Sequence, residues 1–201
     1  MNILLTLLLA YLLGAIPFGY ILVRLTTGGD VRATGSGNIG ATNVLRTTGR
    51  AAGVVTLLLD IGKGFAAVWL ASRLTEGSPM WMSFAALAVM AGHSYPVFLG
   101  FKGGKAVASW VGAFLCLMPA PLTATLVVFV VTVAVSRYVS LGSVLAAGLL
   151  PLAVWLISHP PLPVVAAAFV AGAFIIWRHK PNLERIRAGQ EHVLSFRGKR
   201  K

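Results

Sequence analysis

The residues best suited to chemistry lie in a polar, glycine-dense stretch, residues 35–46, which follows the first long apolar segment. Glycine adopts backbone angles that other residues avoid, so such a loop can turn successive N–H groups inward. Inward N–H groups form an anion-binding concavity, and the guanidinium of Arg46 adds a positive charge. We therefore predict that this loop holds a phosphate. The candidate ligands are Gly35, Gly37, Asn38, Gly40, Thr42, Asn43 and Arg46.

Two other interpretations of this stretch are available. Its glycines also spell G-x-G-x-x-G, the dinucleotide-binding fingerprint, but that motif requires a preceding strand, and an apolar helix-length segment stands here instead. A flexible linker is the simpler alternative, since glycine and serine are common in linkers. The asparagine, threonine and arginine side chains are more hydrogen-bonding groups than a linker needs, which favours phosphate binding.

A second cluster, residues 102–105, reads Lys-Gly-Gly-Lys, and we expect it to open a helix. Free N–H groups at a helix start, with an ammonium nearby, form an anion site, so Gly103, Gly104 and Lys105 are candidates. The stretch is not a Walker A motif, because the chain has leucine and alanine where that motif requires glycine and serine or threonine. Two positive-inside lysines beside a glycine turn are the alternative, which suits Lys102 equally well; for Lys105 we favour a function.

Two further polar groups flank apolar segments. Ser143 stands near the start of one, where a serine is usually a helix cap. His179 follows another and could bind a hydroxyl or phosphate, or act as a base. The alternative for residues 178–182 is a basic patch attracted to anionic lipid. His179 and Glu184 stand in an H-x-x-x-x-E arrangement similar to the H-x-x-x-x-D dyad of soluble-type glycerolipid acyltransferases, but the imperfect match gives Glu184 no catalytic role.

Other chemically notable residues lie inside apolar segments. Asp60 and Lys63 are three residues apart on one helix face, so we expect them to pair with each other. We interpret His93 as a hydrogen-bonded structural histidine. The single cysteine, Cys116, excludes a disulfide and a cysteine-based metal site, and we expect a buried, inert thiol.

Composition defines the elements that must position these residues. A chain of 201 residues that is 57% hydrophobic and 11% charged is typical of an integral membrane protein. A net charge of +12 would suggest a nucleic-acid partner for a soluble protein, but the positive-inside rule explains it without one. The first segment lacks a basic n-region and a clean cleavage site, so we interpret it as a retained span rather than a signal peptide.

The apolar segments predict an all-α, polytopic membrane helix bundle in one domain, residues 1–201. Of the 17 basic residues, all except Lys63 and Arg73 fall on one side, which predicts about seven spans, an outside N-terminus and a cytoplasmic C-terminus. Prolines interrupt residues 106–136, so this region is either two short spans or a re-entrant hairpin. The expected apolar segments are residues 2–25, 51–72, 80–99, 106–136, 141–158 and 164–177.

Three strings, in order, resemble the motifs of the bacterial acyl-phosphate:glycerol-3-phosphate acyltransferases, the PlsY family. Residues 35–43 are similar to its first motif, GSGNxGAxN, and residues 92–108 to its second. Residues 178–191 are similar to the third, where Leu183 and Ile186 replace an expected isoleucine and leucine. The resemblance covers nearly the whole chain.

The resemblance implies transfer of a fatty acyl group from acyl phosphate to the 1-hydroxyl of glycerol 3-phosphate, giving lysophosphatidic acid and phosphate. It implies a bacterial inner-membrane enzyme whose site faces the cytoplasm, with membrane lipid as a partner and without nucleic acid, metal or cofactor. The family's functional residues map onto Ser36, Arg46, Lys105, Ser143, His179 and Asn182, with Ser36, Lys105, Ser143 and His179 as catalytic residues.

Acyl phosphate is a mixed anhydride with a good leaving group, so the enzyme mainly has to bring two polyanions together and stabilise charge. Direct attack without a covalent acyl-enzyme fits, with the substrate's own phosphate taking the proton. A small anion transporter is the rival from another class, with Asp60 and Lys63 as midplane charges. A lipid-head-group phosphotransferase would need a carboxylate-rich metal site, which five scattered acidic residues do not supply.

Overall fold

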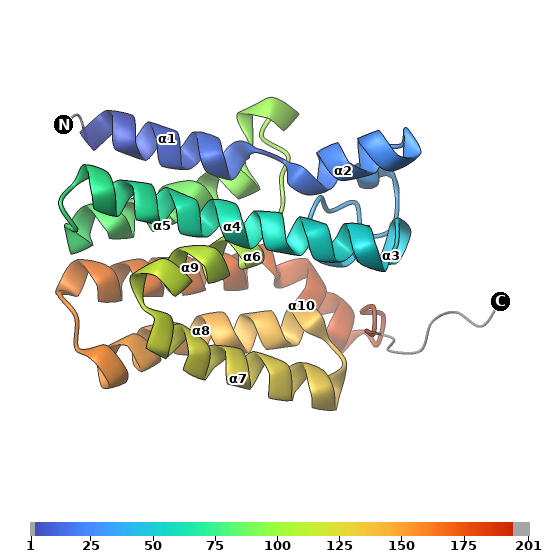
Figure 1. The fold of residues 1–201 in the computed structure, drawn as a ribbon. Coiled ribbons are helices and arrows are strands. Elements are labelled where there is room, and N and C mark those ends of the chain that lie inside the picture. Colours follow the sequence, from blue (N-terminus) through green and yellow to red (C-terminus); the bar gives the residue numbers. More distant parts are fainter. Residues whose placement is uncertain (1–2, 195–201) are drawn as a thin grey trace. The chain divides into compact units, whose positions relative to one another are not determined.

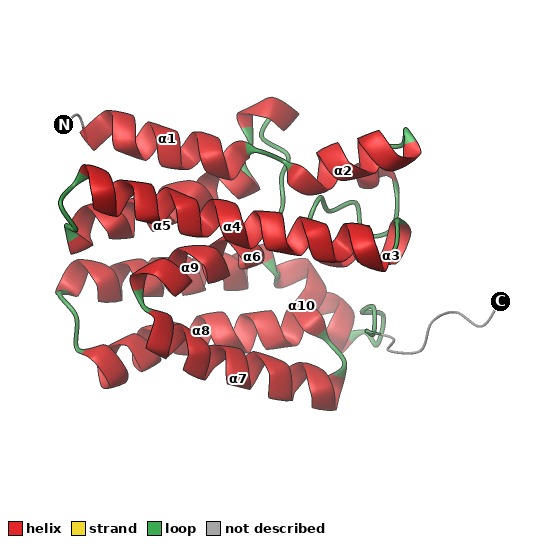
Figure 2. Ribbon diagram, viewed as in Figure 1, coloured by secondary structure: helices red, strands yellow, loops and turns green. Residues whose placement is uncertain are grey.

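The computed structural model describes residues 3–194, and within them the chain is all-helical (Figure 2). This confirms the predicted fold class. The order of elements along the chain is traced in Figure 1. The helices are α1 (Ile3–Ala15), α2 (Phe18–Thr27), η1 (Val31–Ala33), α3 (Ala41–Thr47), α4 (Arg50–Leu74), α5 (Pro79–Ser94), η2 (Val97–Leu99), α6 (Val107–Leu117), α7 (Pro119–Ser136), α8 (Val139–Ser158), α9 (Leu162–Arg178) and α10 (Lys180–Arg187).

The chain forms two compact units, which divide between Leu117 and Met118. In the first, which we call unit 1, the long helix α4 packs against α1, α2, α5 and α6. Glycines allow the closest approaches: a Cβ at Gly64 would overlap the carbonyl oxygen of Ser109, and a Cβ at Gly112 would overlap that of Ile61. Small residues at such crossings let membrane helices approach backbone to backbone.

The first predicted span is broken in the structure. α1 ends at Ala15 and α2 begins at Phe18, because Pro17 lacks an N–H group and restricts the residue before it. α2 then packs on the glycine-rich stretch, where a Cβ at Gly19 would overlap the carbonyl oxygen of Ile39. The break therefore brings the first span against the predicted phosphate loop.

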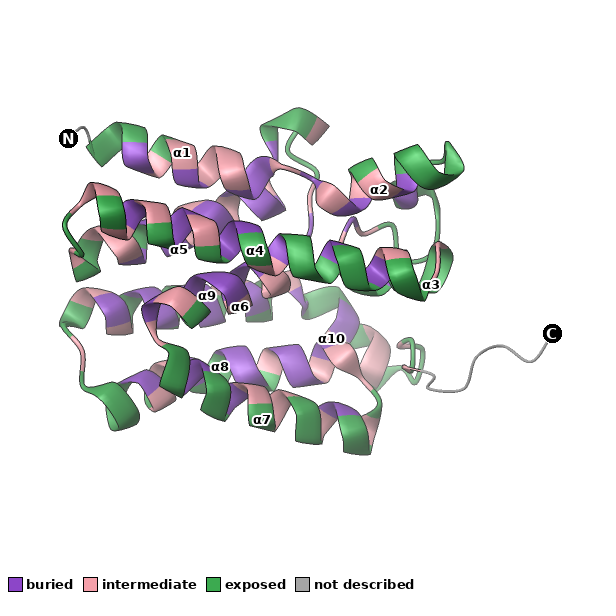
Figure 3. Cartoon of the chain, in the orientation of Figure 1, coloured by how far each residue is buried: buried purple, intermediate pink, exposed green. Residues whose placement is uncertain are grey.

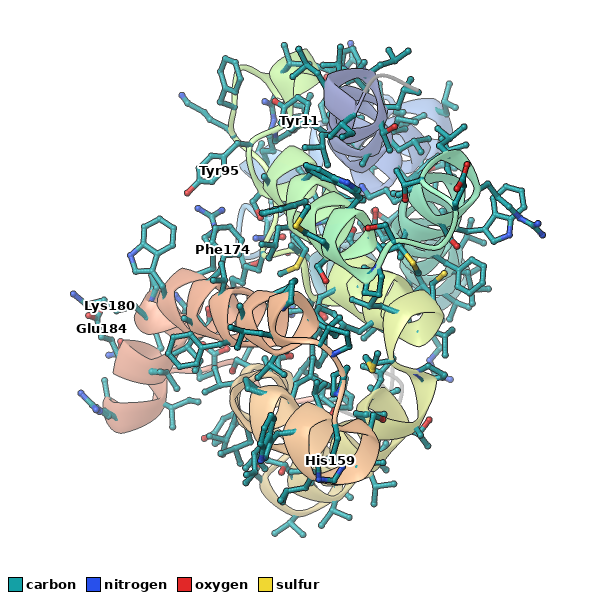
Figure 4. The ribbon with its side chains drawn as sticks, turned by 90° about the vertical axis from the view of Figure 1, so that its left-hand side faces the viewer. Tyr11, Tyr95, His159, Phe174, Lys180 and Glu184 are labelled. Carbon is teal, nitrogen blue, oxygen red and sulfur yellow. The ribbon has the colours of Figure 1, made fainter. Side chains whose placement is uncertain are left out.

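In the second unit, unit 2, α8 packs between α7 and α9. α9 bends by 50° into α10. Pro181 lies in the first turn of α10, where a proline is compatible with a helix start. His159 is the C-cap residue of α8, in the loop before α9 (Figure 4).

Five helical segments of residues 3–194 are long and apolar enough to cross a membrane, or six if the bent α9–α10 pair counts as one span. Residues 106–136 divide unequally into α6, with 11 residues, and α7, with 18. Cys116 on α6 is half-buried rather than buried as expected. The count of about seven spans, the outside N-terminus and the single domain stay predictions.

Burial is distributed as in a membrane protein. Large apolar side chains such as Leu25, Val135 and Leu162 are exposed, while the buried positions include many alanines and several polar groups (Figure 3). Apolar side chains that face outward suit a lipid solvent, in which backbone polar groups must be satisfied within helices. Several of the buried polar groups belong to the clusters described next.

Candidate active site

The predicted phosphate loop is organised around Asn43, the third residue of α3, whose side chain is 2% exposed. Its Nδ2 donates to the carbonyl oxygens of Val31 at 3.1 Å, Thr34 at 3.1 Å and Asn38 at 2.9 Å. Its Oδ1 accepts from the N–H of Ser36 at 2.9 Å. The side-chain amide of Asn43 therefore bonds to the backbone of the loop through both its nitrogen and its oxygen, and we assign it a structural role there.

The glycines of the loop are explained by the same arrangement. Gly35 has a φ of +60°, and a Cβ there would overlap Oδ1 of Asn43. Gly37 also lies in the left-handed region, with a φ of +69°. Asn38 Oδ1 accepts from the N–H of Gly40 at 2.8 Å, an Asx turn that leads into α3. Loop shape, rather than mere flexibility, is what these residue types provide.

The other predicted residues of this loop have exposed side chains. Ser36, Thr42 and Arg46 are all exposed, Thr42 and Arg46 on α3 and Ser36 at the glycine turn. Before them, Asp30 caps η1 and pairs with Arg32 at 2.7 Å. The hydrogen bond from Arg32 holds the pKa of Asp30 below its usual value.

An apolar cluster joins the first two predicted motifs. Val31, Ile39 and Val44 from the loop region pack with Val23 of α2, and Leu99 of η2 packs against them. η2 immediately precedes the Lys-Gly-Gly-Lys stretch, so two segments about 60 residues apart in the chain meet in unit 1.

The Lys-Gly-Gly-Lys stretch differs from the expected helix start. α6 begins only at Val107, and the N–H groups of Gly103 and Gly104 donate to the carbonyl oxygens of Ser94 and His93, each at 3.1 Å. The expectation that these two N–H groups are free to bind an anion is therefore wrong. The glycines instead allow close packing, because a Cβ at Gly103 would overlap the carbonyl oxygen of His93.

Lys105 itself lies half-buried between this pinned backbone and α6. The next residue, Ala106, is fully buried with a φ of +61°, a conformation that L-residues rarely adopt. Phe101, at the start of the segment, has a φ of +63°. Backbone of this kind persists only where the surrounding structure over-determines it, and such positions cluster at functional sites.

Beside this segment lies a buried polar cluster. Lys63 Nζ is 2.9 Å from Asp60 Oδ1, which confirms the predicted pair. His93 is buried and its Nδ1 lies 3.3 Å from the hydroxyl of Ser109, which confirms a hydrogen-bonded histidine. His93 Nδ1 also lies 3.6 Å from Asp60 Oδ1, a contact between two different helices that no spacing in the sequence indicates.

Unit 2 contains a second cluster, centred on the carboxylate of Glu191. One oxygen accepts from Ser140 Oγ at 2.9 Å and from Asn182 Nδ2 at 2.6 Å, and the other from Arg185 Nε at 2.7 Å. Burial raises the pKa of Glu191, but the hydrogen bonds from Asn182, Arg185 and Ser140 outweigh it and hold the pKa below its usual value. The cluster ties the start of α8 to α10.

Glu191 was part of the third motif, but the sequence assigned it no role. Its partners lie 6, 9 and 51 residues away, and the most distant spacing could not be predicted without the packing of α8. The only signal in the sequence was that Asn182 and Arg185 stand within ten residues of Glu191. Asn182 is thereby oriented through its Nδ2, and it is 6% exposed.

Ser143 and His179 are both buried and both bonded to the backbone of their own helix. Ser143 Oγ donates to the carbonyl oxygen of Val139 at 2.9 Å. The helix-cap alternative for Ser143 is wrong, because α8 begins at Val139. His179 Nδ1 lies 2.8 Å from the carbonyl oxygen of Ile175, which requires a proton on Nδ1 and puts the acceptor lone pair of the neutral ring on Nε2.

Two other sequence expectations concern neighbouring groups. Glu184 is exposed on α10, on the outer side with Lys180 (Figure 4), whereas His179 is buried, in keeping with no catalytic pairing between the two. Within residues 3–194 no three His, Cys, Asp or Glu side chains lie together as a metal site. Chemistry without metal or cofactor stays a prediction.

Comparison with known proteins identifies the family. A family model described as glycerol-3-phosphate acyltransferase matches residues 4–189. Curated relatives with the name glycerol-3-phosphate acyltransferase include those of Desulforamulus reducens, 48% identical over 90% of both chains, and Geobacter sulfurreducens, 46% identical over 91% of this chain and 93% of the relative.

Solved structures agree. The glycerol 3-phosphate form of PlsY (YgiH), an integral membrane glycerol 3-phosphate acyltransferase, matches with a TM-score of 0.91 and 39% identity over 97% of this chain and 96% of that one. Its lysophosphatidic acid form matches with a TM-score of 0.88 and 38% identity, over the same shares of the two chains.

The helical membrane fold and these matches define a membrane-embedded acyltransferase. The chain belongs to the glycerol-3-phosphate acyltransferase (PlsY) family, as the three sequence motifs predicted. It is an integral membrane protein of several spans.

Proposed function

We propose that this acyltransferase takes its acyl group from acyl phosphate and transfers it to the 1-hydroxyl of glycerol 3-phosphate. The observation that carries the proposal is Lys105, half-buried on a backbone segment that is pinned at Gly103 and Gly104 and strained at Ala106. A fixed ammonium suits a reaction whose departing group is a phosphate, because charge develops at one predictable place.

The reaction balances without a protein nucleophile. The 1-hydroxyl oxygen forms a bond to the carbonyl carbon, the bond between that carbon and the phosphate oxygen breaks, and the hydroxyl proton goes to a phosphate oxygen of the substrates. The protein then has to supply binding, alignment and charge stabilisation. Lysophosphatidic acid and inorganic phosphate are the products.

Residues of both units receive roles in this scheme. In unit 1, Ser36, Thr42 and Arg46 lie exposed on a shaped loop and suit contacts with phosphate oxygens. Gly35, Gly37, Asn38, Gly40 and Asn43 fix the shape of that loop, and Gly103 and Gly104 fix the Lys105 segment. In unit 2, Ser143, His179 and Asn182 are the residues that we propose for substrate binding or alignment.

The rival interpretation, a small anion transporter, rested on Asp60 and Lys63. These side chains pair with each other, and Lys63 also donates to the carbonyl oxygen of Ile16 at 2.8 Å. Nothing in that arrangement favours a translocated ion over an internal structural contact, and the family is one of acyltransferases.

The donor is tested by an assay with purified protein, labelled glycerol 3-phosphate and a chelator. Acyl phosphate, acyl-coenzyme A and acyl carrier protein are supplied in separate reactions. We expect lysophosphatidic acid, acylated at position 1, only with acyl phosphate. Equal or faster product formation with either thioester would refute the proposed donor, and loss of activity with the chelator would refute the metal-free chemistry.

We also propose that the enzyme lies in the bacterial inner membrane with its site facing the cytoplasm. The helix α4 separates the loop with Thr42 from the turn with Glu76, and both residues are exposed. In a Cys116→Ala background, Thr42→Cys should react only after the membrane is permeabilised, whereas Glu76→Cys should react with an impermeant thiol reagent from outside. The reverse pattern would contradict this orientation.

A further inference from the structure

A cluster of four buried polar side chains in unit 1 has no role in the scheme above. Asp60 and Lys63 come from α4, His93 from the end of α5, and Ser109 from α6; none is more than 5% exposed. A buried ion pair is costly in a membrane protein and is replaceable by apolar side chains without loss of stability. The position of this cluster suggests what it does instead.

One end of the cluster holds the broken first span. Lys63 Nζ, 2.9 Å from Asp60 Oδ1, donates to the carbonyl oxygen of Ile16 at 2.8 Å, in the break between α1 and α2. Nearby, Tyr11 of α1 donates its hydroxyl hydrogen to the carbonyl oxygen of Tyr95 at 2.7 Å, and the two tyrosines lie next to each other in Figure 4. Tyr95 is the C-cap of α5, so this end of α5 is fixed to α1.

The other end of the cluster touches the Lys105 segment. His93 Nδ1 lies 3.6 Å from Asp60 Oδ1 and 3.3 Å from Ser109 Oγ, while its carbonyl oxygen accepts from the N–H of Gly104 at 3.1 Å. The far side of the ring packs on the same glycine, because a Cβ at Gly104 would overlap His93 Nε2. His93 therefore contacts both the buried carboxylate and the backbone one residue before Lys105.

We propose that Asp60, through His93, positions the 101–106 segment so that Lys105 meets the reacting phosphate. Asp60 and His93 are positioning residues, not catalytic ones, and the proposal rests on the proposed function of Lys105. The physical reason is that the left-handed conformations at Phe101 and Ala106 need support from outside the segment. The imidazole faces the carboxylate and the hydroxyl with Nδ1 and packs on Gly104 with its Nε2 edge, so both edges of the ring are supported.

A charge-free replacement separates positioning from folding. The double variant Asp60→Leu/Lys63→Met removes both charges at similar volume, so its melting temperature should stay near the wild-type value or rise. We expect kcat with acyl phosphate to fall by about 10- to 100-fold, because small misplacements of a reacting group have effects of that size. The KM for glycerol 3-phosphate should change much less. Wild-type kcat in a folded double variant would overturn the proposal.

Amide hydrogen exchange of residues 101–106 gives a readout that does not depend on activity. In the double variant the Gly103 and Gly104 amides should exchange at least about tenfold faster, because opening of this segment becomes easier. Exchange in residues 34–43 should not change. Unchanged exchange at both glycines, or a uniform rise in both regions, would overturn the proposal. If wild-type protein fails to use acyl phosphate, the proposed function fails, and this measurement still decides the positioning role.

Two replacements of His93, one polar and one apolar, provide a matched comparison. His93→Asn keeps a polar atom near the Nδ1 position, whereas His93→Leu does not. We expect the asparagine variant to retain clearly more kcat than the leucine variant at comparable melting temperatures. Thr56→Val, one turn before Asp60 on α4, is the control, since Thr56 bonds only within its helix to Ala52 in the described contacts. Equal kcat in the two His93 variants would contradict positioning through Nδ1.

Discussion

Unit 1 shapes its polar loop around the neutral amide of Asn43, whereas unit 2 ties α8 to α10 around the carboxylate of Glu191. The first hub bonds mainly to backbone carbonyl oxygens, and the second only to side chains. The stability of the loop around neutral Asn43 should not depend on the ionisation of its hub. It should depend on steric fit, because the neighbouring glycines leave no room for a Cβ. A charged hub depends on its ionisation and on three separate side chains. The two regions should therefore fail in different ways.

The largest expected effect is on turnover in unit 1. Lys105→Ala should lower kcat by about 10²–10³-fold, as the loss of a preorganised charge-stabilising group does elsewhere. Its melting temperature in detergent should stay nearly unchanged. Lys102→Ala, three residues earlier and exposed, is the matched control and should keep most of the activity. Parallel losses of activity and stability in Lys105→Ala would return Lys105 to a structural role.

The next effect is on the stability of the unit 1 loop. Asn43→Ala removes four hydrogen bonds, three of them to buried or half-buried carbonyl oxygens, and should lower the free energy of unfolding by about 2–4 kcal/mol. Asn38→Ala removes the single bond to Gly40 and should cost about 1 kcal/mol. Ser36→Ala should lower activity without a change in stability. Equal stability of Asn43→Ala and Asn38→Ala would show that Asn43 is not the hub.

A smaller effect, dependent on pH, is expected in unit 2. The pKa of Glu191 in the folded protein is below its ordinary value of 4.5, so its stabilisation is fully present above that pH and is lost as the pH falls through the folded pKa. The melting temperature of the wild type should therefore fall as the pH is lowered below 4.5. The Glu191→Gln variant should have a lower melting temperature than the wild type at neutral pH. Its melting temperature should fall less than that of the wild type on acidification. The same acid sensitivity in both proteins would exclude Glu191 as the titrating group.

The smallest effect concerns a charged pair outside the two hubs. Asp30 and Arg32 form a bidentate but solvent-accessible pair on η1. Exposed pairs contribute about 0–1 kcal/mol, so Asp30→Asn should hardly change the melting temperature at moderate salt. A loss as large as that of Asn43→Ala would mean that charge, and not the neutral amide, holds the loop.

Sequence patterns predicted the parts of this protein that depend on local chemistry. Hydropathy gave the all-helical membrane fold, glycine spacing gave the loop, and the spacing of Asp60 and Lys63 gave their pair. The same patterns wrongly predicted that the N–H groups of Gly103 and Gly104 are free. The carbonyl oxygens that accept from them lie about ten residues earlier, at the end of α5. α10 was not expected from the sequence because it has only eight residues, and its two apolar side chains, Leu183 and Ile186, are too few to reveal a helical period.

The positions of Glu191 and His93 were beyond sequence reasoning for a related reason. Each acts through partners on other helices, such as Ser140 for Glu191 and Asp60 for His93. Their spacing in the chain follows no helical period. Only the packing of α4, α5 and α6, and of α8 and α10, brings these groups together.

The central proposal is that Lys105 and His179 act on the same step of the acyl transfer, and a double-mutant cycle tests it most directly. The ratio kcat/KM is measured for wild type, Lys105→Ala, His179→Ala and the double variant. Groups that act on the same step are strongly non-additive, so the double variant should be about as active as the worse single variant. A double variant whose loss equals the product of the two single losses would show that the two residues contribute independently, against this account.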